Sequence, residues 1–268
     1  MISLYATILA VGVSYLSGAS LSLLGLAKCY FASCCIVMCV AAISACLVFK
    51  DGRSPVGDGS IDRRGFWSAS TSFLLVGVLV YILTSGFVLI AGAALSDEEV
   101  GLIRAAERLG LVVSFVLAVV NNIYPPRLAY FWSVGDLRRL HRLFVRARRV
   151  SCGFALMVGL PLWFFPDYFL GLMLPGVASA GVVRLFLLGC FANAAFGPVG
   201  NLLSMTGNEQ VSRNIACAVV LIALPSYWFA MVNFGAIGAA LSFALISLFW
   251  GGMLTIASYA LLWQRKGY

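Results

Sequence analysis

The sequence has few charged residues and a single histidine. Lysine, arginine, aspartate and glutamate make up 10% of the 268 residues, whereas hydrophobic residues make up 62%. Such a chain has too few polar side chains to cover a soluble globule, which excludes an ordinary water-soluble domain. It also lacks a Ser/His/Asp or Cys/His set, a pair of acids in a loop and a glycine loop for phosphate. We therefore expect neither an enzyme nor a bound cofactor.

Cysteine is present, but its placement predicts no disulfide framework. The eight cysteines fall inside apolar runs, and five of them share one run. Cys34, Cys35 and Cys39 are close in sequence, yet no histidine or acid accompanies them as a further metal ligand. Small residues that pack between helices explain these positions better than a metal site.

Apolar runs of spanning length recur along the whole chain. A helix needs about 20 predominantly apolar residues to cross a bilayer. Eight runs are near or above this length, at 2–26, 29–49, 66–95, 99–126, 150–173, 180–204, 212–232 and 235–263. The expected fold is an all-α integral membrane protein with about eight transmembrane helices.

Most basic residues lie in alternate connections between these runs. They occupy the loops at 50–65 and 127–149, Arg213 and the C-terminal tail, whereas the opposite connections are acidic, as at 97–99, or uncharged. Positively charged loops are retained on the cytoplasmic side, so both termini are predicted to be cytoplasmic. Because the net charge of +8 collects between apolar runs, it indicates membrane orientation, and no nucleic acid partner is expected.

The segment 135–150 has a helical period of its own. Apolar residues recur at Leu140, Phe144 and Ala147 while arginines fill the other side. This pattern is typical of an amphipathic helix that lies on the inner membrane surface in contact with anionic lipids. An ordinary cluster of basic residues that stops membrane insertion explains it equally well.

A polar stripe runs along the predicted helix at 99–126. At 100° per residue, its polar side chains fall within about 140° of arc. They are Arg104, Glu107, Arg108, Ser114, Asn121 and Asn122. An arginine near the bilayer centre costs roughly 2.5–3.5 kcal/mol, so each needs a partner, water or a route to the headgroups. Glu107 can be the partner, and the stripe predicts a helix that lines a wet cavity; snorkelling to the headgroups remains the alternative for both arginines.

The run at 180–204 is a second candidate for a cavity wall. Asn193 and Asn201 lie on a face of small and polar residues, and Gly197 with Pro198 interrupts the helix. Proline frees backbone carbonyls that neighbours or water must satisfy, as Pro125 does where the stripe helix ends. Close helix packing with interhelical hydrogen bonds is the competing explanation.

Three further residues are expected at membrane interfaces. Arg184 points away from the polar face of its helix and is expected at the level of the outer headgroups. Tyr227 and Trp228 follow Pro225, and a kink with two interfacial aromatic residues is typical of an anchor near the outer leaflet.

From Phe66 to its end, the chain resembles the C-terminal part of bacterial polysaccharide flippases. The resemblance rests on EVGLIRAAERLGLVVSFVLAVVNNIYPPRLAYFWSVGDLRRLHRL, then NAAFGPVGNLLSMTGNE and FGAIGAALSFAL. These proteins export O-antigen, capsule and exopolysaccharide repeat units, and they belong to the multidrug/oligosaccharidyl-lipid/polysaccharide exporter superfamily. The shared signals are the acidic turn before Val100, the helix with Arg108, the exit at Pro125, the Gly135-Asp136 turn, the Gly197-Pro198 break and the turn at 206–209.

The resemblance implies a transporter of the bacterial inner membrane with two helical lobes around a central cavity. Its cargo would be an undecaprenyl-diphosphate-linked oligosaccharide, moved from the cytoplasmic to the periplasmic leaflet. Arg104 and Arg108 would hold the diphosphate or acidic sugars, because guanidinium groups bind phosphate oxygens in pairs. Asn121, Asn122, Asn193 and Asn201 would bind sugar hydroxyls.

The same resemblance implies a domain organisation. Residues 66–268 would form one lobe of six helices, and residues 1–50 would be two helices of the other lobe, joined by a cytoplasmic loop at 51–65. Family members commonly have about six spans in each lobe, so about four helices would be absent here. A second chain, or another membrane protein of polysaccharide assembly, would then be needed to close the cavity.

Three other functions remain open. The chain is alternatively an inactive or partner-dependent truncated membrane subunit. It is alternatively a drug or cation antiporter of the same superfamily, which needs an intramembrane acid that Glu107, placed among arginines, serves poorly. A glycan polymerase or transferase comes last, because the sequence has no large periplasmic loop.

Overall fold

The structure is a computed structural model that describes residues 31–32, 34–40, 43, 63–174 and 179–264. Contacts divide the chain into two units, residues 1–61 and 62–268. In the first unit the described residues are helical, and most of the predicted spans at 2–26 and 29–49 lies outside the described residues. The described part of the second unit is also helical and contains no strand, so the all-α prediction is confirmed.

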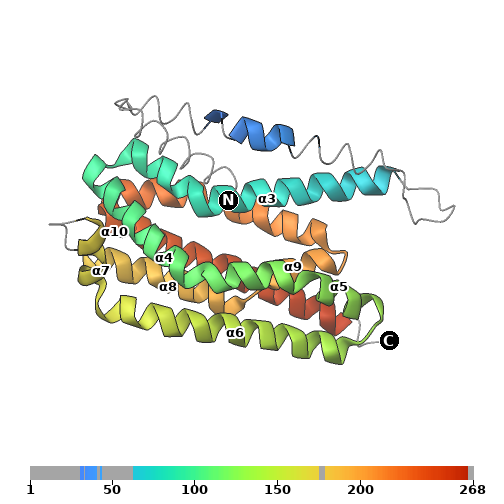
Figure 1. The fold of residues 1–268 in the computed structure, drawn as a ribbon. Coiled ribbons are helices and arrows are strands. Elements are labelled where there is room, and N and C mark those ends of the chain that lie inside the picture. Colours follow the sequence, from blue (N-terminus) through green and yellow to red (C-terminus); the bar gives the residue numbers. More distant parts are fainter. Residues whose placement is uncertain (1–30, 33, 41–42, 44–62, 175–178, 265–268) are drawn as a thin grey trace. The chain divides into compact units, whose positions relative to one another are not determined.

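The described part of the second unit is a series of helices (Figure 1). They are α3 (Arg63–Ala94), α4 (Asp97–Ile123), α5 (Pro125–Ser133), α6 (Leu137–Phe164), α7 (Pro166–Met173), α8 (Ala180–Phe196), α9 (Val199–Met205) and α10 (Glu209–Gln264).

Within the described residues, three helical segments are long and apolar enough to cross a membrane. They are Ser70–Ala94, Ala180–Met205 and Glu209–Leu261, and α6 with α7 becomes a fourth if the two are counted as one bent span. The chain therefore has the helices of a membrane protein. The predicted number of eight spans is not confirmed.

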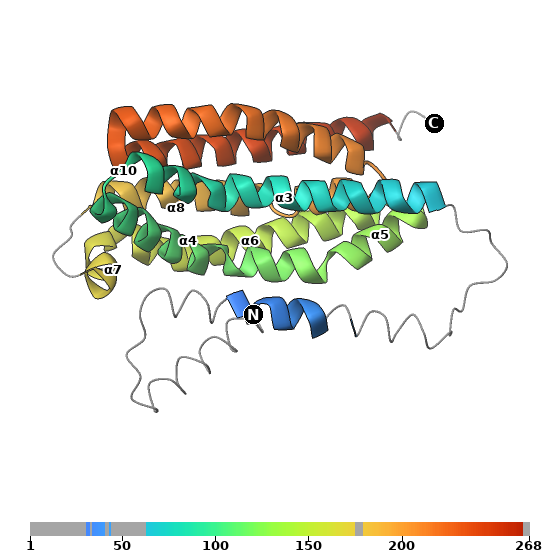
Figure 2. The same cartoon turned by 90° about the horizontal axis from the view of Figure 1, so that it is seen from above.

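Helix α10 reverses its direction at Gly235. This residue has φ 59° and ψ −142°, a conformation that is open essentially to glycine alone. After the reversal Gly238 packs against the backbone of Ala230, so the two arms of α10 lie side by side (Figure 2). The two apolar runs predicted at 212–232 and 235–263 correspond to these arms.

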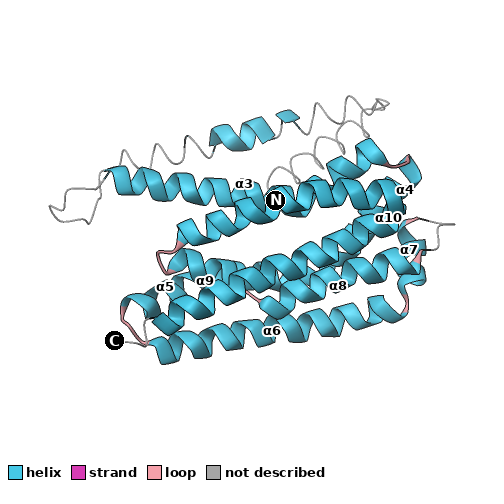
Figure 3. Cartoon of the chain, turned by 180° about the vertical axis from the view of Figure 1, so that it is seen from behind, coloured by secondary structure: helices cyan, strands magenta, loops and turns pink. Residues whose placement is uncertain are grey.

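The turns gather at two ends of the helices in the second unit. The α3–α4 turn, α7 and the reversal at Gly235 lie at one end, and the α5–α6 and α9–α10 turns lie at the other (Figures 1 and 3). The first end carries Asp97, Glu98 and Glu99, whereas the second carries the arginines that begin α6. The acidic and basic connections are thus separated in space.

The apolar run at 150–173, expected as one helix, is divided between two helices. Helix α6 ends at Phe164, and α7 turns away by 83°. The bend follows from Pro166, which has no N–H to continue the ladder and stands at the first position of α7.

The basic segment at 135–150 is the first half of α6, which was not expected. Asp136 caps the helix by accepting a hydrogen bond from the backbone N–H of Arg139 at 2.9 Å. Leu140, Phe144 and Ala147 are buried, the first two in a cluster with α5 and α9. The apolar side of this amphipathic helix is therefore occupied by protein.

Helix α8 lies at the centre of the packing, against α10, α4 and α6. An aromatic cluster joins it to the neighbouring helices. The rings of Phe186 and Phe243 are stacked at 4.2 Å, and Phe87 lies 5.7 Å from Phe186 and 5.9 Å from Tyr227. This cluster forms part of the wall of the cavity described next.

Candidate cargo-binding cavity

A cavity of about 450 Å³ lies between α3, α4, α8, α9 and both arms of α10. Its volume is within the range of about 300–1,000 Å³ that is common for small-molecule sites. Most of its wall is apolar, with polar groups at separate points, as in many ligand sites. The main polar side chains of the lining are Thr84, Ser85, Glu107, Ser114, Asn121, Asn193, Asn201, Ser204, Ser212, Tyr227, Ser247 and Trp250.

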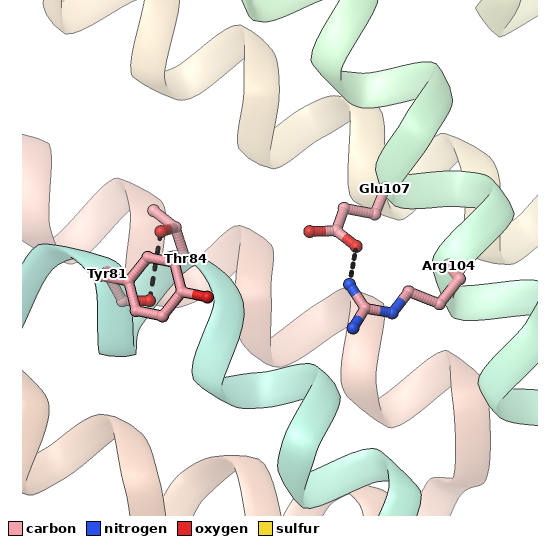
Figure 4. A network of polar contacts seen from close by, with 4 residues as sticks. All are labelled: Tyr81, Thr84, Arg104 and Glu107. Carbon is pink, nitrogen blue, oxygen red and sulfur yellow. Dashed lines mark hydrogen bonds and ion pairs between the residues drawn. The ribbon is translucent and has the colours of Figure 1, made fainter. Parts of the chain in front are cut away.

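An ion pair lies where α4 meets the cavity. Arg104 Nη1 donates to Glu107 Oε2 at 2.9 Å, one turn along the helix. The Arg104 side chain is 49% exposed and that of Glu107 15%, so the carboxylate is enclosed while the guanidinium reaches outward. Figure 4 shows both side chains extending from α4 toward the part of α3 that carries Tyr81 and Thr84.

The polar stripe of α4 divides between two faces of the helix. Glu107, Ser114 and Asn121, spaced seven residues apart, line the cavity. Arg108 and Asn122 are exposed and lie outside the lining, and the amide of Asn122 donates to the carbonyl of Ala118 at 2.8 Å. An arc of about 140° is wide enough to cover both faces. Arg108 was expected to face the cavity, whereas in the structure it lies on the exposed face of α4.

Two of the predicted asparagines meet. Asn201 Nδ2 donates to Asn121 Oδ1 at 3.1 Å and to the backbone carbonyl of Asn121 at 3.2 Å. The carbonyl of Asn121 lies near the end of α4, which stops at Ile123 before Pro125, the first residue of α5. The two amides thus join α4 to α9 at one end of the cavity wall.

The break between α8 and α9 sets the position of Asn201. Gly197 has φ 68°, and a Cβ there would lie 3.2 Å from Cα of Arg148 in α6. The N–H of Gly197 donates to the carbonyl of Asn193 at 3.1 Å, and Pro198 has no N–H to continue the helix. Both break residues line the cavity, as does Asn193, whose amide lies 3.5 Å from the hydroxyl of Ser247.

Several lining residues were not expected from the sequence. Thr84 and Ser85 on α3, and Ser247 and Trp250 on the second arm of α10, lie in runs without a polar stripe. Tyr227 was expected at the outer interface, and this was wrong. It is 1% exposed, and its hydroxyl donates to the carbonyl of Leu83 at 3.1 Å.

The electrostatics of the cavity are set by one acid. Among the described residues that line it, Glu107 is the one with a charged side chain. Arg184, at the far side of α8, is exposed and donates to the carbonyl of Trp163 at 3.2 Å. No group of three or more histidine, cysteine, aspartate or glutamate residues that could hold a metal ion occurs among the described residues.

Comparison with known proteins does not assign the chain to a family. No family model matches the chain, and neither a curated protein nor a solved structure matches it. The family likeness therefore rests on the sequence motifs, and the cavity is interpreted below from its own chemistry.

Proposed function

We propose that this chain moves lipid-linked oligosaccharide repeat units across the bacterial inner membrane during polysaccharide biosynthesis. The observation that carries the proposal is the cavity beside α4, where three amides and several hydroxyl groups line an otherwise apolar space between membrane-type helices. Amides offer both donors and acceptors, which suits sugar hydroxyls. A broken helix at the cavity wall, here α8–α9, is common in transporters.

In the proposed orientation the basic end of the second unit faces the cytoplasm. The first half of α6 then presents its exposed arginines, among them Arg138, Arg142 and Arg146, to anionic headgroups. The acidic turn at 97–99 faces the periplasm. Cargo would move from the basic to the acidic end.

The sugar and the diphosphate would bind at different places. The glycan would occupy the cavity, in contact with Asn193 and with the Asn121–Asn201 pair. The diphosphate would lie against the exposed face of α4, where Arg108 offers a guanidinium group. This arrangement keeps the lipid chain beside the helices and the sugars inside.

The test is a matched pair of amide substitutions in a strain whose surface polysaccharide depends on this gene. Asn193→Leu removes an amide from the cavity, and Asn214→Leu removes one from the exposed side of α10. One hydrogen bond is worth about 1 kcal/mol, so Asn193→Leu should lower export roughly fivefold or more. Repeat units should accumulate on the cytoplasmic leaflet. Equal export by both variants, at the level of the unsubstituted protein, would contradict the proposal.

A second candidate is exchange of cations or cationic drugs. It is favoured by Glu107, an acid that faces the cavity. The ion pair with Arg104 opposes it, because one carboxylate oxygen is already occupied at 2.9 Å. The test uses proteoliposomes that contain a pH-sensitive dye. If the chain exchanges cations for protons, addition of tetraphenylphosphonium should change the internal pH, and Glu107→Gln should abolish this change.

A further inference from the structure

We infer that the cavity selects uncharged sugars and disfavours acidic ones. This inference rests on the proposed function and concerns the charge of the glycan that occupies the cavity. It starts from the division of the α4 stripe, which leaves Arg108 outside the cavity and Glu107 inside it.

The first step concerns charge. A carboxylated sugar that enters the cavity loses water and must be compensated by a cation or by hydrogen bonds. The described lining offers no cationic side chain, and the guanidinium of Arg104 at its edge is already paired with Glu107. The carboxylate of an acidic sugar would therefore lie near the negative charge of Glu107, with no unpaired cation in the described lining to compensate it.

The second step concerns hydrogen bonds. The Oε2 atom of Glu107 accepts from Arg104, whereas Oε1 takes part in no hydrogen bond to the described residues. Carboxylate oxygens accept hydrogen bonds from hydroxyl groups and from N–H groups such as that of an acetamido sugar. Glu107 therefore suits a neutral hexose or an N-acetylated hexosamine.

The third step concerns shape. Trp250 and Phe196 line the cavity together with the amide of Asn193. The apolar faces of pyranose rings pack against aromatic rings. The hydroxyl groups at the edge of the ring form hydrogen bonds with amides. These contacts recognise the ring and need no charge on the sugar.

The experiment uses the full chain in nanodiscs and three probes with the same short polyprenyl diphosphate. One probe is the bare lipid diphosphate, the second carries a trisaccharide of glucose and N-acetylglucosamine, and the third has its terminal glucose replaced by glucuronic acid. The neutral glycan should bind about tenfold more tightly than the acidic one, because specificity here arises from a repelled charge.

Two variants change the charge of the cavity independently. Glu107→Gln should reduce the difference in affinity between the neutral and the acidic glycan probe. Thr84→Lys introduces a cation at an exposed position of the lining, opposite Glu107 in Figure 4, and should raise the affinity for the acidic probe. Gln210→Lys is the control, because it adds the same charge at an exposed position outside the lining. It should leave the difference in affinity between the two glycan probes unchanged.

The outcomes separate this inference from the proposed function. Equal affinity for the two glycans, or tighter binding of the acidic one, overturns the selection of uncharged sugars and leaves the proposed function standing. If neither glycan binds more tightly than the bare lipid diphosphate, the cavity does not hold sugars, and both proposals are overturned.

Discussion

Glu99 Oε1 accepts a hydrogen bond from the backbone N–H of Ala236 at 3.3 Å, which joins the start of α4 to the reversal of α10. The other carboxylate oxygen, Oε2, accepts from the N–H of Ser96 at 3.4 Å and from its hydroxyl at 3.1 Å. Ser96 in turn accepts from the N–H of Glu99, which completes a capping box. One acid therefore satisfies the beginnings of two helical segments far apart in sequence.

Replacement of Glu99 should destabilise the protein. Glu99→Ala removes the carboxylate half of the capping box of α4 and leaves the N–H of Ala236 without its acceptor, a loss of about 1–2 kcal/mol. Glu98→Ala removes the same charge from the same helix turn, but Glu98 is exposed and is therefore the matched control. Thermal unfolding in detergent should show a lower midpoint for Glu99→Ala than for Glu98→Ala. Equal midpoints would be inconsistent with the double cap.

The reversal at Gly235 should tolerate no side chain. Gly235→Ala places a Cβ 2.5 Å from Glu99 Oε1 at a φ of 59°, with an expected cost of about 1–3 kcal/mol. Gly252→Ala, also in α10, has open space around the new Cβ and should be neutral or slightly stabilising. The comparison is made by unfolding in detergent, and a harmless Gly235→Ala would argue against this geometry.

The Asn121–Asn201 pair should show coupling. In a double-mutant cycle with Asn121→Ala and Asn201→Ala, the two substitutions should be non-additive by about 0.6 kcal/mol, a typical value for polar contacts between membrane helices. Asn201→Ala paired with Asn214→Ala serves as the control cycle, because Asn214 lies outside the cavity lining. Strict additivity in the first cycle would refute the contact.

The hydroxyl of Tyr227 should contribute to stability. Tyr227→Phe leaves the packing in place but deletes the hydrogen bond to the carbonyl of Leu83, with an expected loss of about 1 kcal/mol. Tyr259→Phe is the control, because Tyr259 is 49% exposed. A loss of stability confined to Tyr227→Phe is the expected result, and equal effects would contradict it.

Two buried serines should respond in opposite ways. Ser151 is 1% exposed and its hydroxyl has no hydrogen-bond partner among the described residues, so Ser151→Ala should be neutral or stabilising. Ser242 is similarly buried, but its hydroxyl donates to the carbonyl of Ala239 at 3.0 Å. Ser242→Ala should therefore cost more than Ser151→Ala in the free energy of unfolding, and the reverse order would contradict both assignments.

The sequence was a good guide to helix breaks that depend on local chemistry. The Gly197-Pro198 pair was expected to interrupt a helix, because proline removes a donor, and α8 ends there. Pro166 carries the same local signal, but it lies inside an apolar run of spanning length, and hydropathy suggested a continuous helix. Local chemistry prevailed at this position.

The cavity was predicted less completely. The polar arc of α4 contains Glu107 and Asn121, which line the cavity, but periodicity alone does not show which part of the arc α8 and α10 cover. Periodicity therefore did not separate Glu107 from Arg108, which is exposed and lies outside the lining. Ser247 and Trp250 were missed because each is an isolated polar group in an apolar run, brought to the cavity by the reversal of α10.

Helices α3 and α4, which both line the cavity, are bonded to α10 at different places along it. Helix α3 is bonded to α10 through Tyr227–Leu83 and through Arg213 Nη1, which donates to the hydroxyl of Ser72 at 2.9 Å. Helix α4 is bonded to α9 through Asn201, and Glu99 holds it at the end where α3 and α4 join. Because α10 bonds α3 along its first arm and α4 at its reversal, the walls that these two helices contribute to the cavity are held by separate hydrogen bonds, so that loss of one set leaves the other wall attached.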